Sequence, residues 1–138
     1  MLLVHSPFPK TPDSKPDSVN GAKAKGLANF RDMTLYADKC VGRIIDALEE
    51  NGLREKTVII YTTDNGTHRA LTYPYGSEER MGEKAYATDG GTHVPLIINC
   101  PGTVPAGIVS NDLVDFSDML PTIADITGAE LPKLKLDG

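Results

Sequence analysis

Apolar residues recur at steps of three and four along one long segment, which predicts an amphipathic helix over residues 22–51. Charged side chains fill most of the opposite face, and Asn51-Gly52 is a typical C-terminal helix signal. The apolar positions on the predicted inner face are Leu27, Phe30, Met33, Ala37, Ile44, Ile45 and Leu48, with Cys40 or Val41 between them.

Short runs of apolar residues predict strands elsewhere. Residues 57–63 and 94–99 are β-branched and almost continuously apolar at their centres, which is typical of strands buried on both faces of a parallel sheet. Residues 2–4 have the composition of a strand end. Residues 115–126 predict a second helix, capped by Asp115 or Ser117. The order strand, helix, strand, loop, strand, helix indicates the α/β class.

Two segments have no clear period. Residues 5–21 contain closely spaced prolines, which exclude a helix and predict an extended loop. Residues 67–91 are polar and rich in glycine. A loop of that length within a compact domain is usually functional or disordered.

Composition and charge narrow the possible partners. The chain has 138 residues, a typical length for one domain, and a formal net charge of −5. That balance argues against a nucleic-acid backbone as partner, although it leaves room for a local basic site that binds a small anion.

No apolar run reaches the roughly 20 residues of a membrane span, and the first residues lack the basic start of a signal peptide. Cys40 and Cys100 are too few for a disulfide framework or a four-cysteine metal site, and their redox state stays open.

Asp64 and Asn65 are candidate metal ligands. They follow a predicted central strand, and ligand sites in α/β sheets lie beyond the carboxyl ends of strands. Their oxygen donors suit Ca²⁺ or Mg²⁺ better than Zn²⁺. Taken by itself, however, Asn65-Gly66 is more simply interpreted as a hairpin turn.

Three more side chains are candidates for chemistry. His5 lies in the proline-rich loop, Lys84 in the glycine-rich loop, and His93 directly before a predicted strand. Each alone is more often a surface residue or a packed imidazole. Gly90-Gly91 predicts either close backbone approach or positive φ at the entry to that strand.

Taken together, these segments resemble the sulfatase family. The resemblance rests on motifs in the family's order, which cover most of the chain. They are His5-Ser6-Pro7-Phe8, the helix of residues 36–48, Thr63-Asp64-Asn65-Gly66-Thr67, the lysine loop and strand of residues 82–97, and residues 115–122. It implies an alkaline-phosphatase-like α/β fold, with a mainly parallel sheet flanked by helices. It also implies Ca²⁺-dependent hydrolysis of sulfate esters by a Cys-derived formylglycine, in a protein exported to the periplasm or the extracellular space.

The resemblance assigns roles to the candidate residues. Asp64 and Asn65 would supply part of the Ca²⁺ shell. His5 and Lys84 would be catalytic, because they would contact the sulfate and help the leaving oxygen to depart. His93 would contribute to substrate binding, although many relatives carry Arg at its position.

The sequence departs from the family at the nucleophile. Val-Gly-Arg follows Cys40 and Pro-Gly-Thr follows Cys100, so neither cysteine lies in the family's Cys-x-Pro-Ser-Arg motif, and the N-terminal Asp-Asp ligand pair is missing. We therefore expect residues 1–138 to be the C-terminal portion of a sulfatase catalytic domain, inactive alone, with the missing N-terminal portion or a second copy as its partner. Two alternatives are a phosphatase or phosphonate hydrolase of the same superfamily, against which Asn65 counts, and a non-catalytic module that binds an anion or a partner protein.

Overall fold

The computed structural model describes residues 8–15 and 21–133, without the side chains of residues 22–24. The chain divides into two compact units, Met1–Ala106 and Gly107–Gly138, which are described separately below. His5 and the strand expected at residues 2–4 lie outside the described residues. Among the described helices, none is both long enough and apolar enough to cross a membrane.

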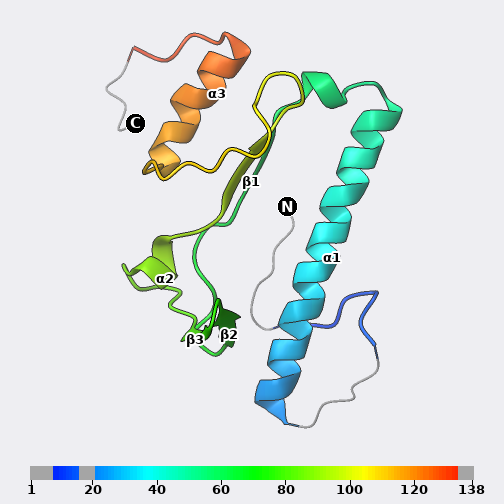
Figure 1. The fold of residues 1–138 in the computed structure, drawn as a ribbon, viewed down its shortest axis with the longest axis vertical. Helices are drawn as coiled ribbons and strands as arrows, with labels where there is room; N and C mark the ends of the chain where they lie inside the picture. Colours follow the sequence, from blue (N-terminus) through cyan, green and yellow to red (C-terminus); the bar gives the residue numbers. More distant parts are fainter. Residues whose placement is uncertain (1–7, 16–20, 134–138) are drawn as a thin grey trace. The chain divides into compact units, whose positions relative to one another are not determined.

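The first unit is dominated by the predicted long helix, α1 (Ala22–Glu50), which confirms the periodicity (Figure 1). It ends where the sequence signal indicates. The Asn51 N–H donates to the Ala47 carbonyl, and Gly52 adopts a φ of 64°. Glycine tolerates this left-handed conformation without a steric penalty. A short 3-10 helix, η1 (Arg54–Lys56), then leads into the first strand.

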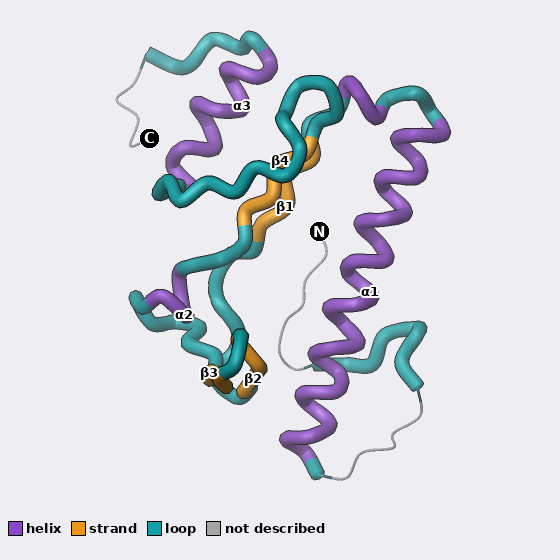
Figure 2. Tube along the Cα trace, in the orientation of Figure 1, coloured by secondary structure: helices purple, strands orange, loops and turns teal. Residues whose placement is uncertain are grey.

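The two predicted apolar strands form a sheet, but its direction differs from the prediction. β1 (Ile59–Thr62) pairs with β4 (Leu96–Asn99) in antiparallel register, from Ile59 opposite Asn99 to Thr62 opposite Leu96 (Figure 2). The expected parallel sheet is therefore wrong for the described residues. A parallel pair needs a crossover, usually a helix that packs on the sheet. Residues 63–95, all of them described, instead form a hairpin and one short helix.

The long polar segment contains the second sheet, which the sequence analysis did not predict. β2 (Thr72–Tyr75) and β3 (Glu78–Met81) form an antiparallel hairpin, with Gly76 at a φ of 61° in its two-residue loop. Pro74 and the fully exposed β3 explain why the alternation typical of a half-buried strand is absent. Leu71, only 2% exposed, anchors the base of the hairpin. The short helix α2 (Asp89–Thr92) then precedes β4.

The second unit confirms the second predicted helix as a 3-10 turn, η2 (Phe116–Asp118), followed by α3 (Met119–Thr127). Asp115, and not Ser117, is the cap: its carboxylate accepts the Ser117 N–H at 2.7 Å, while Asp118 accepts the Asp115 N–H. This hydrogen bond from Ser117 lowers the pKa of Asp115. Gly128, at a φ of 69°, ends the helix.

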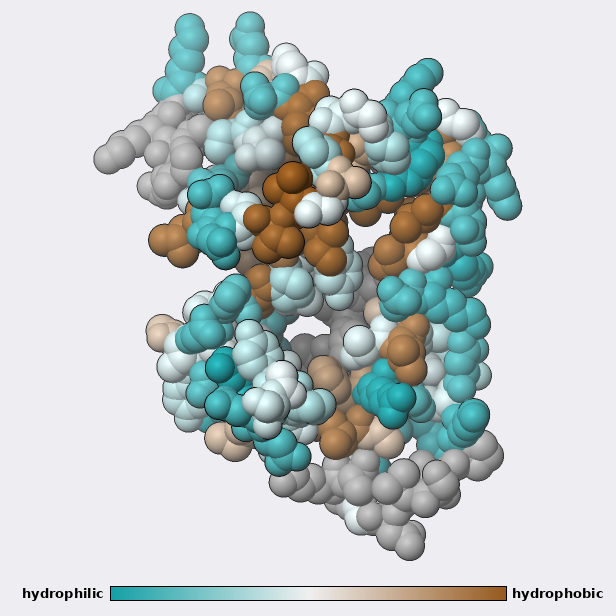
Figure 3. All heavy atoms as spheres, in the orientation of Figure 1, coloured by the Kyte–Doolittle hydropathy of each residue, from teal (hydrophilic) through white to brown (hydrophobic). Residues whose placement is uncertain are grey.

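Few apolar side chains of the described residues are buried. The buried ones are Leu71, Cys100 and Ala124, whereas Val109 is 87% exposed and Leu113 is fully exposed. Tyr61 and Ile97 of the β1–β4 sheet are exposed as well. Apolar side chains consequently lie on the molecular surface (Figure 3). Exposed apolar surface of this extent is typical of a surface that packs against further polypeptide.

Candidate functional site

Backbone hydrogen bonds join the candidate metal-binding segment to the lysine loop. The Gly66 N–H donates to the Gly91 carbonyl at 2.9 Å, and the Lys84 N–H donates to the Thr67 carbonyl at 3.0 Å. The whole β2–β3 hairpin separates these residues in the sequence. The fold therefore brings the Asp64-Asn65 segment and the Lys84 segment side by side, as a joint site requires.

Glycines make this close approach possible. A Cβ atom on Gly66 would lie 1.9 Å from the Gly90 carbonyl oxygen, and one on Gly91 would lie 2.1 Å from the Tyr86 carbonyl oxygen. A Cβ on Gly82 would meet the His68 carbonyl oxygen at 2.3 Å. These distances are far below van der Waals contact. The close approach predicted for Gly90-Gly91 is thus confirmed, and neither residue has a positive φ.

Asp64 and Asn65 lie directly beyond the end of β1. Asp64 is exposed, and Asn65 is half-buried with its amide Nδ2 donating to the Gly66 carbonyl at 3.0 Å. Asn65-Gly66 does not form a hairpin turn, because the partner of β1 is the distant strand β4. Within the described residues, no hydrogen bond or ion pair engages the Asp64 carboxylate.

The chemistry of these two side chains fits Ca²⁺ in part. Both offer hard oxygen donors, but Ca²⁺ takes six to eight oxygen ligands. No group of three or more His, Cys, Asp or Glu side chains that could hold a metal ion occurs in the described part of the chain. Asp64 and Asn65 are therefore compatible with part of a Ca²⁺ shell and would need ligands from other groups to complete it.

Lys84 lies in a tight turn whose backbone is unusual. The Tyr86 N–H donates to the Glu83 carbonyl at 3.0 Å, and the Thr88 hydroxyl donates to the Glu83 carboxylate at 2.6 Å. Ala85 has a φ of 78°, the one positive φ among described residues other than glycine. Strained backbone of this kind concentrates at functional sites.

Replacing Ala85 with glycine should stabilise the chain by about 0.5–1 kcal/mol, because glycine removes the Cβ clash of the left-handed conformation. Urea denaturation followed by circular dichroism measures the change. The matched substitution Ala47→Gly, in the interior of α1, should destabilise the chain by a similar amount. Equal destabilisation by both substitutions would show that Ala85 carries no strain.

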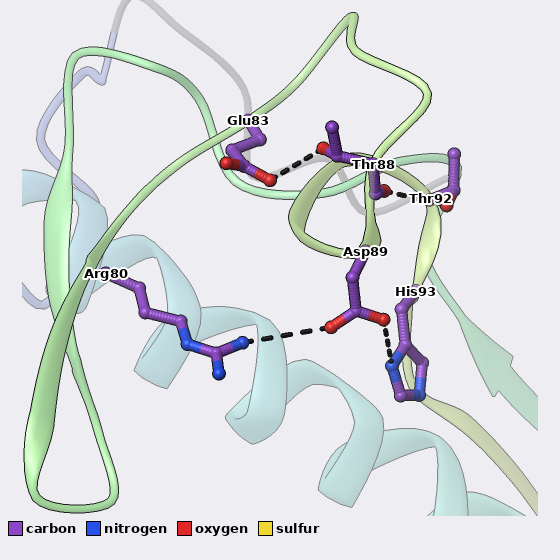
Figure 4. A network of polar contacts seen from close by, with 6 residues as sticks. All are labelled: Arg80, Glu83, Thr88, Asp89, Thr92 and His93. Atoms are coloured by element: carbon purple, nitrogen blue, oxygen red, sulfur yellow. Dashed lines mark hydrogen bonds and ion pairs between the residues drawn. The ribbon is translucent and has the colours of Figure 1, made fainter.

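His93 follows α2 and lies in a surface network (Figure 4). Its Nδ1 is 3.0 Å from Asp89 Oδ1, and Asp89 Oδ2 is 3.8 Å from an Arg80 guanidinium nitrogen. The side chains of His93 and Asp89 are 74% and 70% exposed, so these ion pairs contribute little to stability. The sequence pattern did not indicate that Asp89 and Arg80 lie in a network with His93. Only the i, i+4 spacing of Asp89 and His93 could have indicated their contact.

The described part of the proline-rich loop lies against α1 and the segment after Asp64-Asn65. The Phe8 ring packs edge-on against Phe30 and His68, at centroid distances of 5.5 Å and 6.0 Å. The Asn29 amide donates to the Phe8 carbonyl at 2.7 Å. The described part of the loop thereby contacts His68, which follows Thr67, the residue whose carbonyl accepts the Lys84 N–H. His68, in the polar segment after β1, makes this contact through its imidazole ring. His5 lies outside the described residues.

Comparison with known proteins identifies the family. A family model described as Sulfatase matches residues 3–129. The chain belongs to the sulfatase family. It is 36% identical over 104 residues to an arylsulfatase of Hemicentrotus pulcherrimus, covering 75% of this chain and 19% of that protein. It is 35% identical over 119 residues to arylsulfatase A of Homo sapiens (85% and 23%) and 32% identical over 139 residues to steryl-sulfatase of Mus musculus (95% and 21%).

These matches confirm the family that the sequence motifs indicate. They also show that this sulfatase chain spans about a fifth of the length of the relatives it matches. Family membership implies an alkaline-phosphatase-like fold. The part of the sulfatase described by the structure has α/β content with two small antiparallel sheets.

Proposed function

We propose that this sulfatase chain carries the portion of a sulfate-ester hydrolase site that binds Ca²⁺ and the sulfate group. Asp64 and Asn65 would hold part of the Ca²⁺ shell, while Lys84, His93 and His5 would contact the sulfate. The observation that carries the proposal is the pair of backbone hydrogen bonds that joins the Asp64-Asn65 segment to the Lys84 loop.

The residue types suit the chemistry of sulfate-ester cleavage. Negative charge develops on the bridging oxygen as the bond to sulfur breaks, and fixed cationic donors lower that barrier. The Lys84 ammonium can stabilise this charge, and the His5 imidazole can donate a proton to the leaving oxygen. Bound Ca²⁺ would supply electrostatic stabilisation of the sulfate oxygens.

The covalent step needs a nucleophile from elsewhere. Neither cysteine of the 138 residues lies in a Cys-x-Pro-Ser-Arg motif, and Cys40 lies within α1. We propose that these residues alone do not turn over a sulfate ester, and that further polypeptide supplies the nucleophile. The same observation favours the second candidate function, a non-catalytic module that binds an anion or a partner protein.

The metal assignment predicts weak Ca²⁺ binding by the 138-residue chain, because two side chains supply too few of the six to eight ligands. In a catalytic domain completed with the nucleophile-bearing portion, Asp64→Ala should abolish tight binding, as measured by calorimetry. Asp38→Ala, which removes an exposed carboxylate of α1, is the matched control and should leave binding unchanged. Tight Ca²⁺ binding by the 138 residues alone would contradict a divided metal shell.

A further inference from the structure

The turn that carries Lys84, residues 83–88, is closed by a side-chain hydrogen bond. The Thr88 hydroxyl donates to Glu83 Oε2 at 2.6 Å. Figure 4 draws this contact between the two side chains. The Lys84 N–H is bound to the Thr67 carbonyl, and Ala85 has its φ of 78°. The backbone on both sides of Lys84 is therefore fixed.

Thr88 makes this contact in place of the one that its position favours. It is the N-cap residue of α2, and a threonine there commonly accepts a backbone N–H of the first helical turn. The Thr88 side chain makes no capping hydrogen bond and donates to Glu83 instead. Its carbonyl still accepts the Gly91 and Thr92 N–H groups, so Thr88 connects the lysine turn to α2.

Glu83 also packs closely over the start of α2. A Cβ atom on Gly90 would lie 2.5 Å from Glu83 Oε2. The absence of a side chain at Gly90 thus leaves the space that the Glu83 carboxylate occupies. The Glu83 carboxylate therefore accepts the Thr88 hydroxyl and occupies the space that Gly90 leaves open. Glu83 also directly precedes Lys84 in the sequence.

We propose that Glu83 and Thr88 are positioning residues for Lys84, an inference that rests on the proposed function of this lysine. The lysine side chain is a flexible four-carbon stem, so the direction of the backbone decides which positions its ammonium can reach. Small displacements of a reacting or binding group can cost large factors in rate or affinity. The Glu83–Thr88 hydrogen bond restricts the turn to one backbone conformation and thereby aims Lys84 at the sulfate.

Protection of Lys84 from acylation by inorganic sulfate tests the inference on the 138-residue chain itself. Peptide mass spectrometry reports the acylation rate of Lys84, with the exposed Lys56 of the same molecule as internal reference. Thr88→Val should raise the sulfate concentration for half-protection about fivefold, the factor expected for one lost hydrogen bond. Thr88→Ser restores the hydroxyl and should remain close to the unchanged chain.

Further variants keep the test decisive if Thr88→Val fails to fold. Glu83→Ala should weaken protection as Thr88→Val does, whereas Glu83→Gln keeps an acceptor oxygen and should retain it. Ser110→Ala removes a hydroxyl-to-carboxylate hydrogen bond of the same 2.6 Å length in the second unit and should have no effect.

The outcomes separate the inference from the function on which it rests. If sulfate protects Lys84 equally in the unchanged chain, Thr88→Val and Glu83→Ala, the positioning role is overturned and the sulfate contact stands. If sulfate does not protect Lys84 even in the unchanged chain, the sulfate contact fails, and the positioning role fails with it.

Discussion

Lys84→Ala in a completed catalytic domain should lower kcat/KM for an aryl sulfate by about a hundredfold or more, by analogy with the loss of an oxyanion-hole donor. The loss follows from the proposed role, in which the ammonium makes charge-assisted hydrogen bonds to the sulfate in a partly water-excluded site. Lys84→Arg should recover little of the activity, because a planar guanidinium does not replace a compact ammonium.

The same substitution should leave stability almost unchanged. Lys84 is half-buried. Its hydrogen bond to the Thr67 carbonyl is donated by the backbone N–H, which alanine retains. The expected change in the free energy of unfolding is within about 0.5 kcal/mol. Thermal melts measure this change, and Lys56→Ala is the control for removal of a surface charge. Unaltered kinetics in Lys84→Ala would identify Lys84 as a solvated loop residue and would weaken the whole site assignment.

Local structure was predictable where one physical signal dominated. The period of α1 and the Asn51-Gly52 ending come from side-chain spacing and backbone freedom, which are local properties of the sequence. The capping of η2 by Asp115 is local for the same reason. The apolar compositions of β1 and β4 likewise indicate strands.

Strand direction was not predictable from those compositions. A continuous apolar run is equally compatible with any strand that packs a large apolar surface, and here the runs include the exposed residues Tyr61 and Ile97. The sequence pattern did not indicate the β2–β3 hairpin, because Pro74 lies within β2 and β3 is exposed along its length. Its anchoring depends on Leu71 and on backbone contacts between segments, which no local pattern encodes.

In the candidate site too, the sequence indicated individual residues but not the contacts between them. Residue type, the place of Asp64 and Asn65 after a strand, and the resemblance to the sulfatase motifs made Asp64, Asn65 and Lys84 candidates. The contacts that arrange them were not predictable, because they are backbone hydrogen bonds and glycine contacts between segments far apart in sequence. The contacts of Thr67, His68 and Glu83 are therefore visible only in the structure. The roles of all the candidate site residues stay predictions, and His5 also lies outside the described residues.

Gly66→Ala should be the most damaging small substitution in the first unit. The added Cβ would lie 1.9 Å from the Gly90 carbonyl oxygen, which belongs to a backbone and cannot rotate away as a flexible side chain can. The segment after β1 would have to separate from residues 90–91, which breaks the hydrogen bond from Gly66 to Gly91. The expected loss is about 3 kcal/mol, the upper end of the usual cost of overpacking.

Gly42→Ala is the matched control for this prediction. Gly42 lies within α1, and a Cβ there would meet nothing within 4 Å. Alanine should therefore stabilise the chain by about 0.5–1 kcal/mol through its higher helix propensity. Urea denaturation of the two variants should give changes of opposite sign, and faster amide hydrogen exchange at Lys84 should accompany Gly66→Ala alone. If Gly66→Ala were as stable as Gly42→Ala, the close contact that joins the Asp64-Asn65 segment to the lysine loop would be absent, and the joint site would lose its structural basis.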